Sequence, residues 1–277
     1  MSGLKNKQNG KVFSWNIANV NNFIKETDKD KAVQISLNEI RKQEKILGKP
    51  PKVLEAGCGN GRVIVWLGMH GVKNVCGIEA NDEIVKEFKT KFPKFDVRCG
   101  DIMNLPKDFR NHDVVLSYGV VEHFPDGVSR PLKQMYQDLS VSGTAIVTVP
   151  LLSVFRKIKY LIYEGRKWDK NKYIYCPEFY ENGEFYLYWL TKKQFRKELK
   201  QAGFKIEKHA YTAIECGVLE ALNHKNIPGR FIWRDDKRHF HFTFFGKILY
   251  CIMKCMPWCF AHMQLYVCKK NLISGLP

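Results

Sequence analysis

The residues with the clearest chemical potential lie at positions 53–62, where an apolar stretch leads into a turn with three alternating glycines. Glycines permit a sharp turn and let a ligand approach the backbone without a Cβ in the way. Glu55 stands two residues before the first glycine, and its carboxylate suits a cofactor with an ammonium group and would repel a pyrophosphate. A dinucleotide fingerprint also needs a further glycine where Arg62 stands. The turn therefore predicts a binding site for a cofactor that carries an ammonium group.

Further polar residues follow the ends of three later apolar stretches. Glu79 ends the second stretch, where its carboxylate can accept hydrogen bonds from both hydroxyls of a ribose, and Asp101 follows the third, where it can bind an adenine amine. Ser117 and Tyr118 end the fourth stretch, next to a glycine that lets the backbone approach a ligand. Open α/β sheets bind ligands at the carboxyl ends of their strands, so these residues are expected at one site.

Alternating strands and helices must position these residues. The apolar pattern predicts strands at 52–56, 74–78, 96–99, 113–117 and 144–149, with helices at 62–70, 81–91 and 128–139. Such alternation is typical of a mostly parallel sheet covered by helices on both faces. Residues 15–48 have helical spacing of apolar residues, which ends at Gly48, Pro50 and Pro51.

After residue 150 this alternation stops. A helix is predicted at 191–203, with Thr191 as N-cap and Gly203 at its end, followed by strands at 204–210 and 263–269. The segments 151–190 and 212–246 are basic and have no clear period. We therefore predict an N-terminal helical lid at 1–48 and one α/β domain at 49–277, with substrate-cap insertions at about 151–190 and 212–246.

Taken together, these residues resemble the class I S-adenosylmethionine-dependent methyltransferases, in particular the type 11/12 group. The resemblance covers roughly residues 50–150, then 190–211 and the closing strand. It implies a Rossmann-like, seven-stranded, mostly parallel sheet with a final antiparallel strand, and S-adenosylmethionine as the cofactor. The expected cofactor contacts are Glu55, Ala56, Gly57, Cys58, Gly59, Asn60, Gly61, Glu79, Ala80, Asp101, Ile102, Ser117 and Tyr118.

Glu122 and His123 are the candidate catalytic residues, because they directly follow the fourth strand. His123 can act as a general base that removes a proton from the acceptor. The alternative is that the pair caps the following helix. In the quinone-pathway O-methyltransferases and the small-RNA 3′-end methyltransferases, a similar pair binds a divalent metal together with a Glu three residues earlier. Gly119 occupies that position here, and we therefore expect no metal.

Charge and cysteine content bear on location and partners. The chain has 45 Lys+Arg against 28 Asp+Glu, a formal net charge of +17, which favours anionic partners or reflects a solvated basic surface. Nine cysteines without a regular framework, and no secretory signal in the sequence given, predict a reducing, cytoplasmic location. Cys251, Cys255 and Cys259 recur every fourth residue, but Pro257 interrupts the segment, so we expect small buried thiols and no metal site.

The methyl acceptor is less well determined by the sequence. The fourth strand lacks the Asn/Asp-Pro-Pro-aromatic tetrad that resembling enzymes use on nucleic-acid amino groups. We therefore favour a small-molecule or glycan/lipid-linked acceptor that is methylated at oxygen, and the basic charge of the chain would suit an anionic one. An RNA-directed methyltransferase and a non-catalytic S-adenosylmethionine-binding protein at a membrane surface are the alternatives. The sequence does not predict the oligomeric state.

Residues 240–262 combine aromatic and aliphatic side chains with Lys247 and Lys254. Such a segment can lie at a membrane surface, here the inner face, with its lysines against anionic lipid. The alternative, which we favour from the sequence, is a helix that packs on the sheet beside the final strand.

Overall fold

The computed structural model describes residues 27–163, 174–175, 186–222, 231–234 and 240–270. Its main sheet has seven strands in the order β3-β2-β1-β4-β5-β11-β8. Strands β1 to β5 pair in parallel, and β11 is antiparallel to both of its neighbours. The Rossmann-like sheet with a final antiparallel strand is therefore confirmed. The strands are β1 (Lys52–Ala56), β2 (Asn74–Glu79), β3 (Asp96–Cys99), β4 (His112–Tyr118), β5 (Leu139–Pro150), β8 (Phe204–Thr212) and β11 (Met263–Lys270).

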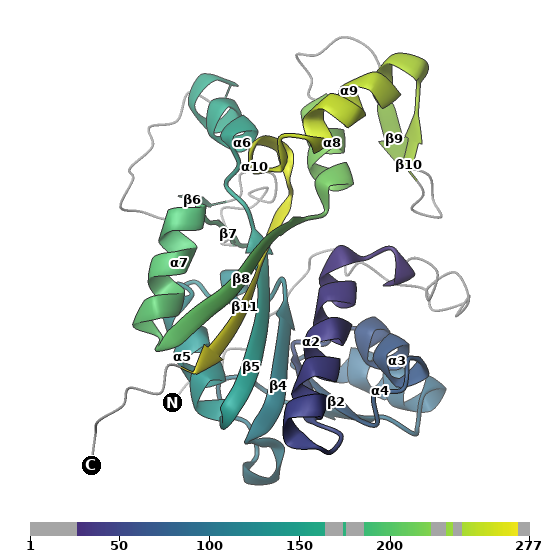
Figure 1. Cartoon of the computed structure of the whole chain (residues 1–277), viewed down its shortest axis with the longest axis vertical. Coiled ribbons are helices and arrows are strands. Elements are labelled where there is room, and N and C mark those ends of the chain that lie inside the picture. The colour runs from purple at the N-terminus through teal and green to yellow at the C-terminus, as the bar shows by residue number, and fades with distance from the viewer. Residues whose placement is uncertain (1–26, 164–173, 176–185, 223–230, 235–239, 271–277) are drawn as a thin grey trace.

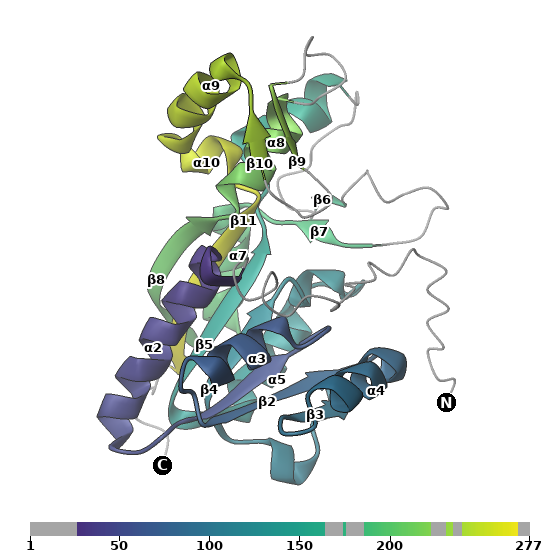
Figure 2. The ribbon, with the colours of Figure 1, turned by 90° about the vertical axis from the view of Figure 1, so that its right-hand side faces the viewer.

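Helices cover both faces of this sheet (Figures 1 and 2). One face packs against α2 (Lys31–Leu47), α3 (Arg62–Met69) and α4 (Asp82–Lys91), whose buried residues include Val33, Trp66 and Phe88. The other face packs against α5 (Ser129–Asp138) and α7 (Lys192–Gln201), through Leu132 and Phe195 among others. Burial on both sides explains why the parallel strands are continuous apolar runs.

Local capping sets where the helices begin and end. Asp30 accepts a hydrogen bond from the Ala32 N–H at the start of α2, and Gly48 ends this helix with a positive φ of 65°. The predicted cap of α7 is also present, as a capping box in which Thr191 and Gln194 bond each other's backbone. The first part of the predicted lid, residues 1–26, lies outside the described residues, so the lid stays a prediction.

The elements after β5 form a second layer above the sheet, here called the cap. Its described elements are α6 (Val154–Ile158), the π-helix η3 (Lys159–Tyr163), the strands β6 (Ile174–Tyr175) and β7 (Tyr188–Trp189), α8 (Ile214–Leu222), the hairpin β9 (Ile232–Arg234) and β10 (Phe240–Phe242), α9 (Phe244–Lys254) and α10 (Pro257–Phe260). The segment 212–246 was expected to be irregular. That expectation was wrong for α8, whose Val218, Ala221 and Leu222 are buried in the cap's own apolar cluster.

Strand pairing explains why the cap lies above one particular edge of the sheet. Met263, the first residue of β11, pairs with Pro150 at the end of β5 and with Thr212 at the end of β8. The chain therefore enters and leaves the cap at the carboxyl edge of the parallel strands. Open α/β sheets bind their ligands at this edge, and the figures show the cap above it (Figures 1 and 2).

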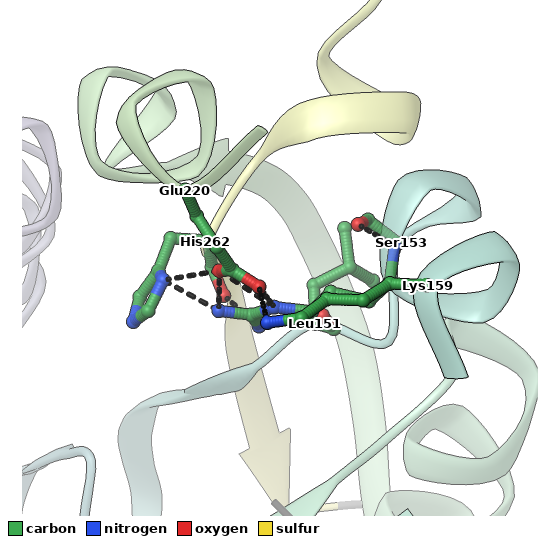
Figure 3. A network of polar contacts seen from close by, with 6 residues as sticks. Leu151, Ser153, Lys159, Glu220 and His262 are labelled. Carbon is green, nitrogen blue, oxygen red and sulfur yellow. Dashed lines mark hydrogen bonds and ion pairs between the residues drawn. The ribbon is translucent and has the colours of Figure 1, made fainter. Parts of the chain in front are cut away.

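A buried ion pair ties the cap to this edge (Figure 3). Arg156 of α6 donates to both carboxylate oxygens of Glu220 on α8, with Nη2 to Oε2 at 2.7 Å, and Nη1 donates to the carbonyls of Leu151 and His262. Arg156 Nη2 also lies 2.5 Å from Nδ1 of His262, which faces the pair in Figure 3. Burial alone would raise the pKa of Glu220, but Arg156 and His262 hold it well below its usual range. The guanidinium thus joins α6, α8 and the start of β11.

Candidate active site at the carboxyl edge of the sheet

The glycine turn after β1 is fixed to the end of β2. The N–H groups of Gly57 and Cys58 both donate to the carbonyl of Ile78, at 2.9 and 3.0 Å. Gly57 has a φ of +75°, and a Cβ there would lie 2.6 Å from the side chain of Val120, so only glycine fits. At Gly59 a Cβ would meet no described atom within 4 Å, so the backbone is open to a ligand. The turn is therefore open at Gly59, where a bound molecule can approach the backbone.

Glu55 lies under this turn at the end of β1. Its side chain is buried, and among the described residues Oε2 has no hydrogen-bond partner. Burial raises the pKa of Glu55 to about 8, against a lowering effect of Arg62, and nearby Glu79 raises it further. An unpaired buried carboxyl is costly unless a donor or a cation reaches it. The site thus fits a cationic ligand group.

Glu79 ends β2 and faces the same turn. Its Oε2 accepts from the Gly59 N–H at 2.9 Å, and its Oε1 accepts from the Asn81 N–H at 3.0 Å. These bonds fix the carboxylate, and each oxygen retains a lone pair for a further donor. Ala80 follows as an exposed residue. This arrangement suits a carboxylate that binds the hydroxyls of a ribose.

Asp101 and Ile102 follow β3 beside this carboxylate. The Gly100 N–H donates to the carbonyl of Glu79 at 2.9 Å, which joins the two strand ends. Asp101 is exposed, and its Oδ1 accepts from the Met103 N–H at 2.8 Å, while Ile102 is buried. The second carboxylate oxygen of Asp101 is thus available for an adenine amine.

Two further buried polar atoms at this edge lack a partner among the described residues, Oγ of Ser117 and Nδ2 of Asn60. Tyr118 differs, because its hydroxyl donates to Ser36 of α2 and its side chain packs with that helix. The Cys58 side chain likewise lies in the core, against Gly77. Tyr118 and Cys58 can therefore reach a ligand only through their backbone. Together with Glu55, the unpaired atoms form a polar site that fits the predicted cofactor.

Glu122 and His123 lie in the short 3₁₀ helix η2 (Val121–His123), directly after β4. Glu122 is buried beside Gly119, and burial raises its pKa to about 8, so it is mostly protonated at neutral pH. His123 is exposed, and its Nδ1 lies 2.8 Å from the carbonyl of Tyr186, which requires the proton to be on Nδ1. Desolvation by nearby atoms lowers the pKa of His123, while the Tyr186 carbonyl opposes this effect. Nε2 is therefore left as a proton acceptor.

The contact between His123 and the Tyr186 carbonyl was not predicted, and no local sequence pattern indicates it. Tyr186 lies 63 positions from His123 in a segment without a clear period, and the Tyr186 ring packs edge-on against the imidazole at 4.9 Å. Val120, which packs over Gly57, was also not predicted.

The cysteine repeat at Cys251, Cys255 and Cys259 lies in the described part of the chain. No group of three or more His, Cys, Asp or Glu side chains that could hold a metal ion is found there. The expectation of buried thiols at the four-residue repeat was wrong, since Cys251 and Cys255 are exposed and Cys259 is partly buried. They lie on α9, directly after it and on α10, all within the cap.

The chain matches a known protein family. The family model described as "Methyltransferase domain" matches residues 30–209. The match covers α2, the sheet up to most of β8, and every candidate site residue. The resemblance to class I methyltransferases is thereby confirmed.

Curated relatives match a shorter part of the chain. A protein of Mycolicibacterium smegmatis named as a probable S-adenosylmethionine-dependent methyltransferase is 29% identical over 98 residues, which is 35% of this chain and 37% of the relative. An uncharacterized protein of Haemophilus influenzae is 24% identical over 54% of this chain and 62% of its own length. The chain thus matches about a third of the length of the first relative and somewhat under two thirds of the second.

Solved structures share the fold. An S-adenosylmethionine-dependent methyltransferase from Mesorhizobium loti superposes with a TM-score of 0.52 at 14% identity, covering 79% of this chain and 91% of its own. A Haloferax volcanii methyltransferase, crystallised with the Trm112 activator, gives 0.52 at 16% identity, covering 82% of this chain and 85% of that one. At these identities the likeness is one of fold.

Proposed function

The chain belongs to the methyltransferase-domain family, and from this premise we propose that it transfers a methyl group from S-adenosylmethionine to an oxygen of a small-molecule or lipid-linked acceptor. One observation carries the proposal. The buried carboxyl of Glu55, whose Oε2 has no partner among the described residues, lies beneath an open glycine turn, next to the fixed carboxylate of Glu79. This combination offers one partner for an ammonium group and another for a ribose, at the edge where such sheets bind ligands.

The residues of the turn would hold the cofactor, which supplies an activated methyl group on its sulfonium. Glu55 and the open backbone at Gly59 would contact its amino-acid end, Glu79 its ribose, and Asp101 with Ile102 its adenine. The protein's main tasks are then to align the acceptor oxygen with the methyl group and to exclude water.

His123 is the residue proposed to accept the acceptor's proton, at Nε2. The Tyr186 carbonyl fixes its tautomer, and its lowered pKa keeps the ring neutral at neutral pH, as a general base requires. Glu122, buried and mostly protonated, would position η2 beside the cofactor and could donate a hydrogen bond. The cap, which begins and ends at this same edge, would select the acceptor.

Incubation of the protein with methyl-tritiated S-adenosylmethionine and a fractionated cell lysate tests the proposal. We expect label in a fraction of small or lipid-extractable molecules, reduced with Glu79→Ala at cofactor concentrations near the Kd of the unaltered protein and strongly reduced with His123→Gln. Cofactor binding without label in any fraction would contradict catalysis and support a non-catalytic binding protein.

The RNA-directed alternative has one supporting observation. Helix α7 presents Lys192, Lys193, Arg196, Lys197 and Lys200 around one surface depression, which suits a polyanion. Label in the RNA fraction, with binding that weakens steeply as salt rises, would favour this alternative.

A further inference from the structure

Helix α9 is apolar on two opposite sides. Its inner side contributes Met253, Leu249 and Tyr250 to the apolar cluster of the cap. Phe244 and Phe245 on its outer side are nevertheless 74% and 67% exposed. A helix that is apolar all round is normally buried all round. The favoured expectation of a helix packed on the main sheet was wrong, because α9 packs on α8, α10 and β10 at the far end of the cap (Figures 1 and 2).

The exposed side chains form one continuous stripe. Phe244, Phe245, Ile248 and Ile252 fall within an arc of about 100° when each residue turns the helix by about 100°. Ile248 and Ile252 are 46% and 53% exposed, and Trp258 on α10 is 52% exposed. These five residues are here called the apolar face. Scattered single apolar residues are normal on a surface, whereas a grouped set marks an interaction site.

The charged residues within the described segments α6, η3, α9 and α10 are all basic, and Glu215 of α8 accepts a hydrogen bond from Tyr250 on the inner side of α9. The segments of α6, η3, α9 and α10 contain no Asp or Glu. Lys247 and Lys254 are exposed and lie about 60–80° to one side of the stripe on α9. Cations beside an apolar stripe with a tryptophan match the interface of an anionic bilayer, where acyl chains and headgroups lie at adjacent depths.

Other elements of the cap also expose apolar side chains. Helix α10 packs on α6, and the α6–η3 segment exposes Ile158, Leu161 and Ile162. Helices α6 and α9 both lie at the end of the molecule beyond the carboxyl edge of the sheet (Figure 1). No helix among the described residues has the length and apolarity to cross a bilayer. Any membrane contact of the described residues would therefore be made from the surface.

We propose that the apolar face of α9 and α10 docks this protein on an anionic lipid surface, with Lys247 and Lys254 against the headgroups. Docking would place the cap between the bilayer and the candidate active site, which suits a lipid-linked acceptor. Docking does not depend on methyl transfer. The vesicle assay can therefore fail while the labelling assay succeeds, and the reverse is also possible.

Vesicle co-sedimentation tests this proposal with phosphatidylcholine vesicles that either contain or lack phosphatidylglycerol. We expect the protein to sediment with the anionic vesicles at low salt and to sediment less at physiological salt. The triple variant Phe244→Ser, Phe245→Ser and Ile248→Ser should partition at least about tenfold less, since each residue loses apolar area buried in lipid.

A matched control carries three comparably exposed residues from outside the cap. Ile46→Ser, Met69→Ser and Val141→Ser remove side chains that are 62%, 57% and 68% exposed. This control should sediment like the unaltered protein. Calorimetric binding of S-adenosylmethionine by both triple variants shows that each is folded.

The charge contribution has its own pair of variants. Lys247→Glu with Lys254→Glu should weaken binding to anionic vesicles by about tenfold or more, because roughly 1 kcal/mol is at stake for each lysine. Lys45→Glu with Lys49→Glu, at the distant end of α2, should leave binding unchanged.

Three results would overturn the proposal. The protein could stay in the supernatant with anionic vesicles at low salt. The apolar-face variant could sediment as well as the control variant. Sedimentation velocity could instead show a dimer that the apolar-face variant abolishes, which would make this face an interface between two copies of the chain.

Discussion

Cofactor affinity should depend on pH through Glu55, and Glu55→Gln should remove that dependence. Without ligand, burial raises the pKa of this carboxyl to about 8, so it is mostly protonated at pH 7. An ammonium group beside it would favour the ionised form and lower its pKa. At pH 7, binding should then release roughly 0.9 proton from Glu55, and affinity should rise by up to about tenfold per pH unit between about pH 6 and 7.5.

Stability of the unliganded protein should show the opposite trend. The folded chain keeps a proton on Glu55 that the unfolded chain loses above about pH 4.3, so the folded state binds more protons between that pH and about 8. The free energy of unfolding therefore falls as pH rises through this window, by up to about 1.4 kcal/mol per pH unit for this one carboxyl. Glu55→Gln should flatten the curve.

Isothermal titration calorimetry in two buffers with different protonation enthalpies measures the proton release. The free ligand's own amine is the same in every titration, so the difference between unaltered protein and Glu55→Gln reports the proton balance that Glu55 controls. Glu122→Gln is the matched control, because Glu122 is equally buried with a pKa of about 8 but belongs to η2. Equal proton release from unaltered protein and Glu55→Gln would refute the placement of Glu55 beside the ammonium group.

The remaining predictions concern the metal, the general base and the cap. Because Gly119 replaces a carboxylate, methyl transfer should survive EDTA; loss on chelation with recovery on adding magnesium or zinc would show a metal at Glu122 and His123. His123→Gln should lower kcat by about 100-fold or more and leave the Kd for the cofactor unchanged. If the cofactor Kd rose by the same factor as kcat fell, His123 would have a structural role. Arg156→Met should lower the free energy of unfolding by about 3 kcal/mol, because the buried Glu220 then keeps only its longer contacts with Lys159 at 3.8 Å and His262 at 3.6 Å. Adding Glu220→Leu should restore part of this loss in urea unfolding, and a loss that is simply additive would contradict the pairing.

The sheet was predictable because its signals are local. Buried parallel strands are continuous apolar runs, and caps such as Thr191 and Gly48 mark helix ends. The edge where the candidate cofactor residues meet follows from the same pattern, because the carboxyl ends of parallel strands share one edge. Their individual roles stay predictions that binding experiments must decide.

The cap was less predictable, for identifiable reasons. Helix α8 has only nine residues, so its apolar spacing gives a weak periodic signal. Helix α9 is apolar on both sides, and periodicity cannot show which side packs on the protein. The orientation of His123 depends on a carbonyl 63 positions away, and no local pattern encodes such a contact.

Titration of the purified protein with S-adenosylmethionine, with NAD as control, tests whether the carboxyl edge of the sheet holds the cofactor site. We expect one site that binds S-adenosylmethionine but not NAD, and in which Glu79→Ala or Asp101→Ala weakens binding by about 1–3 kcal/mol. Unchanged affinity in both variants, or no binding by the unaltered protein, would contradict the assignment of the cofactor site to the carboxyl edge of the sheet.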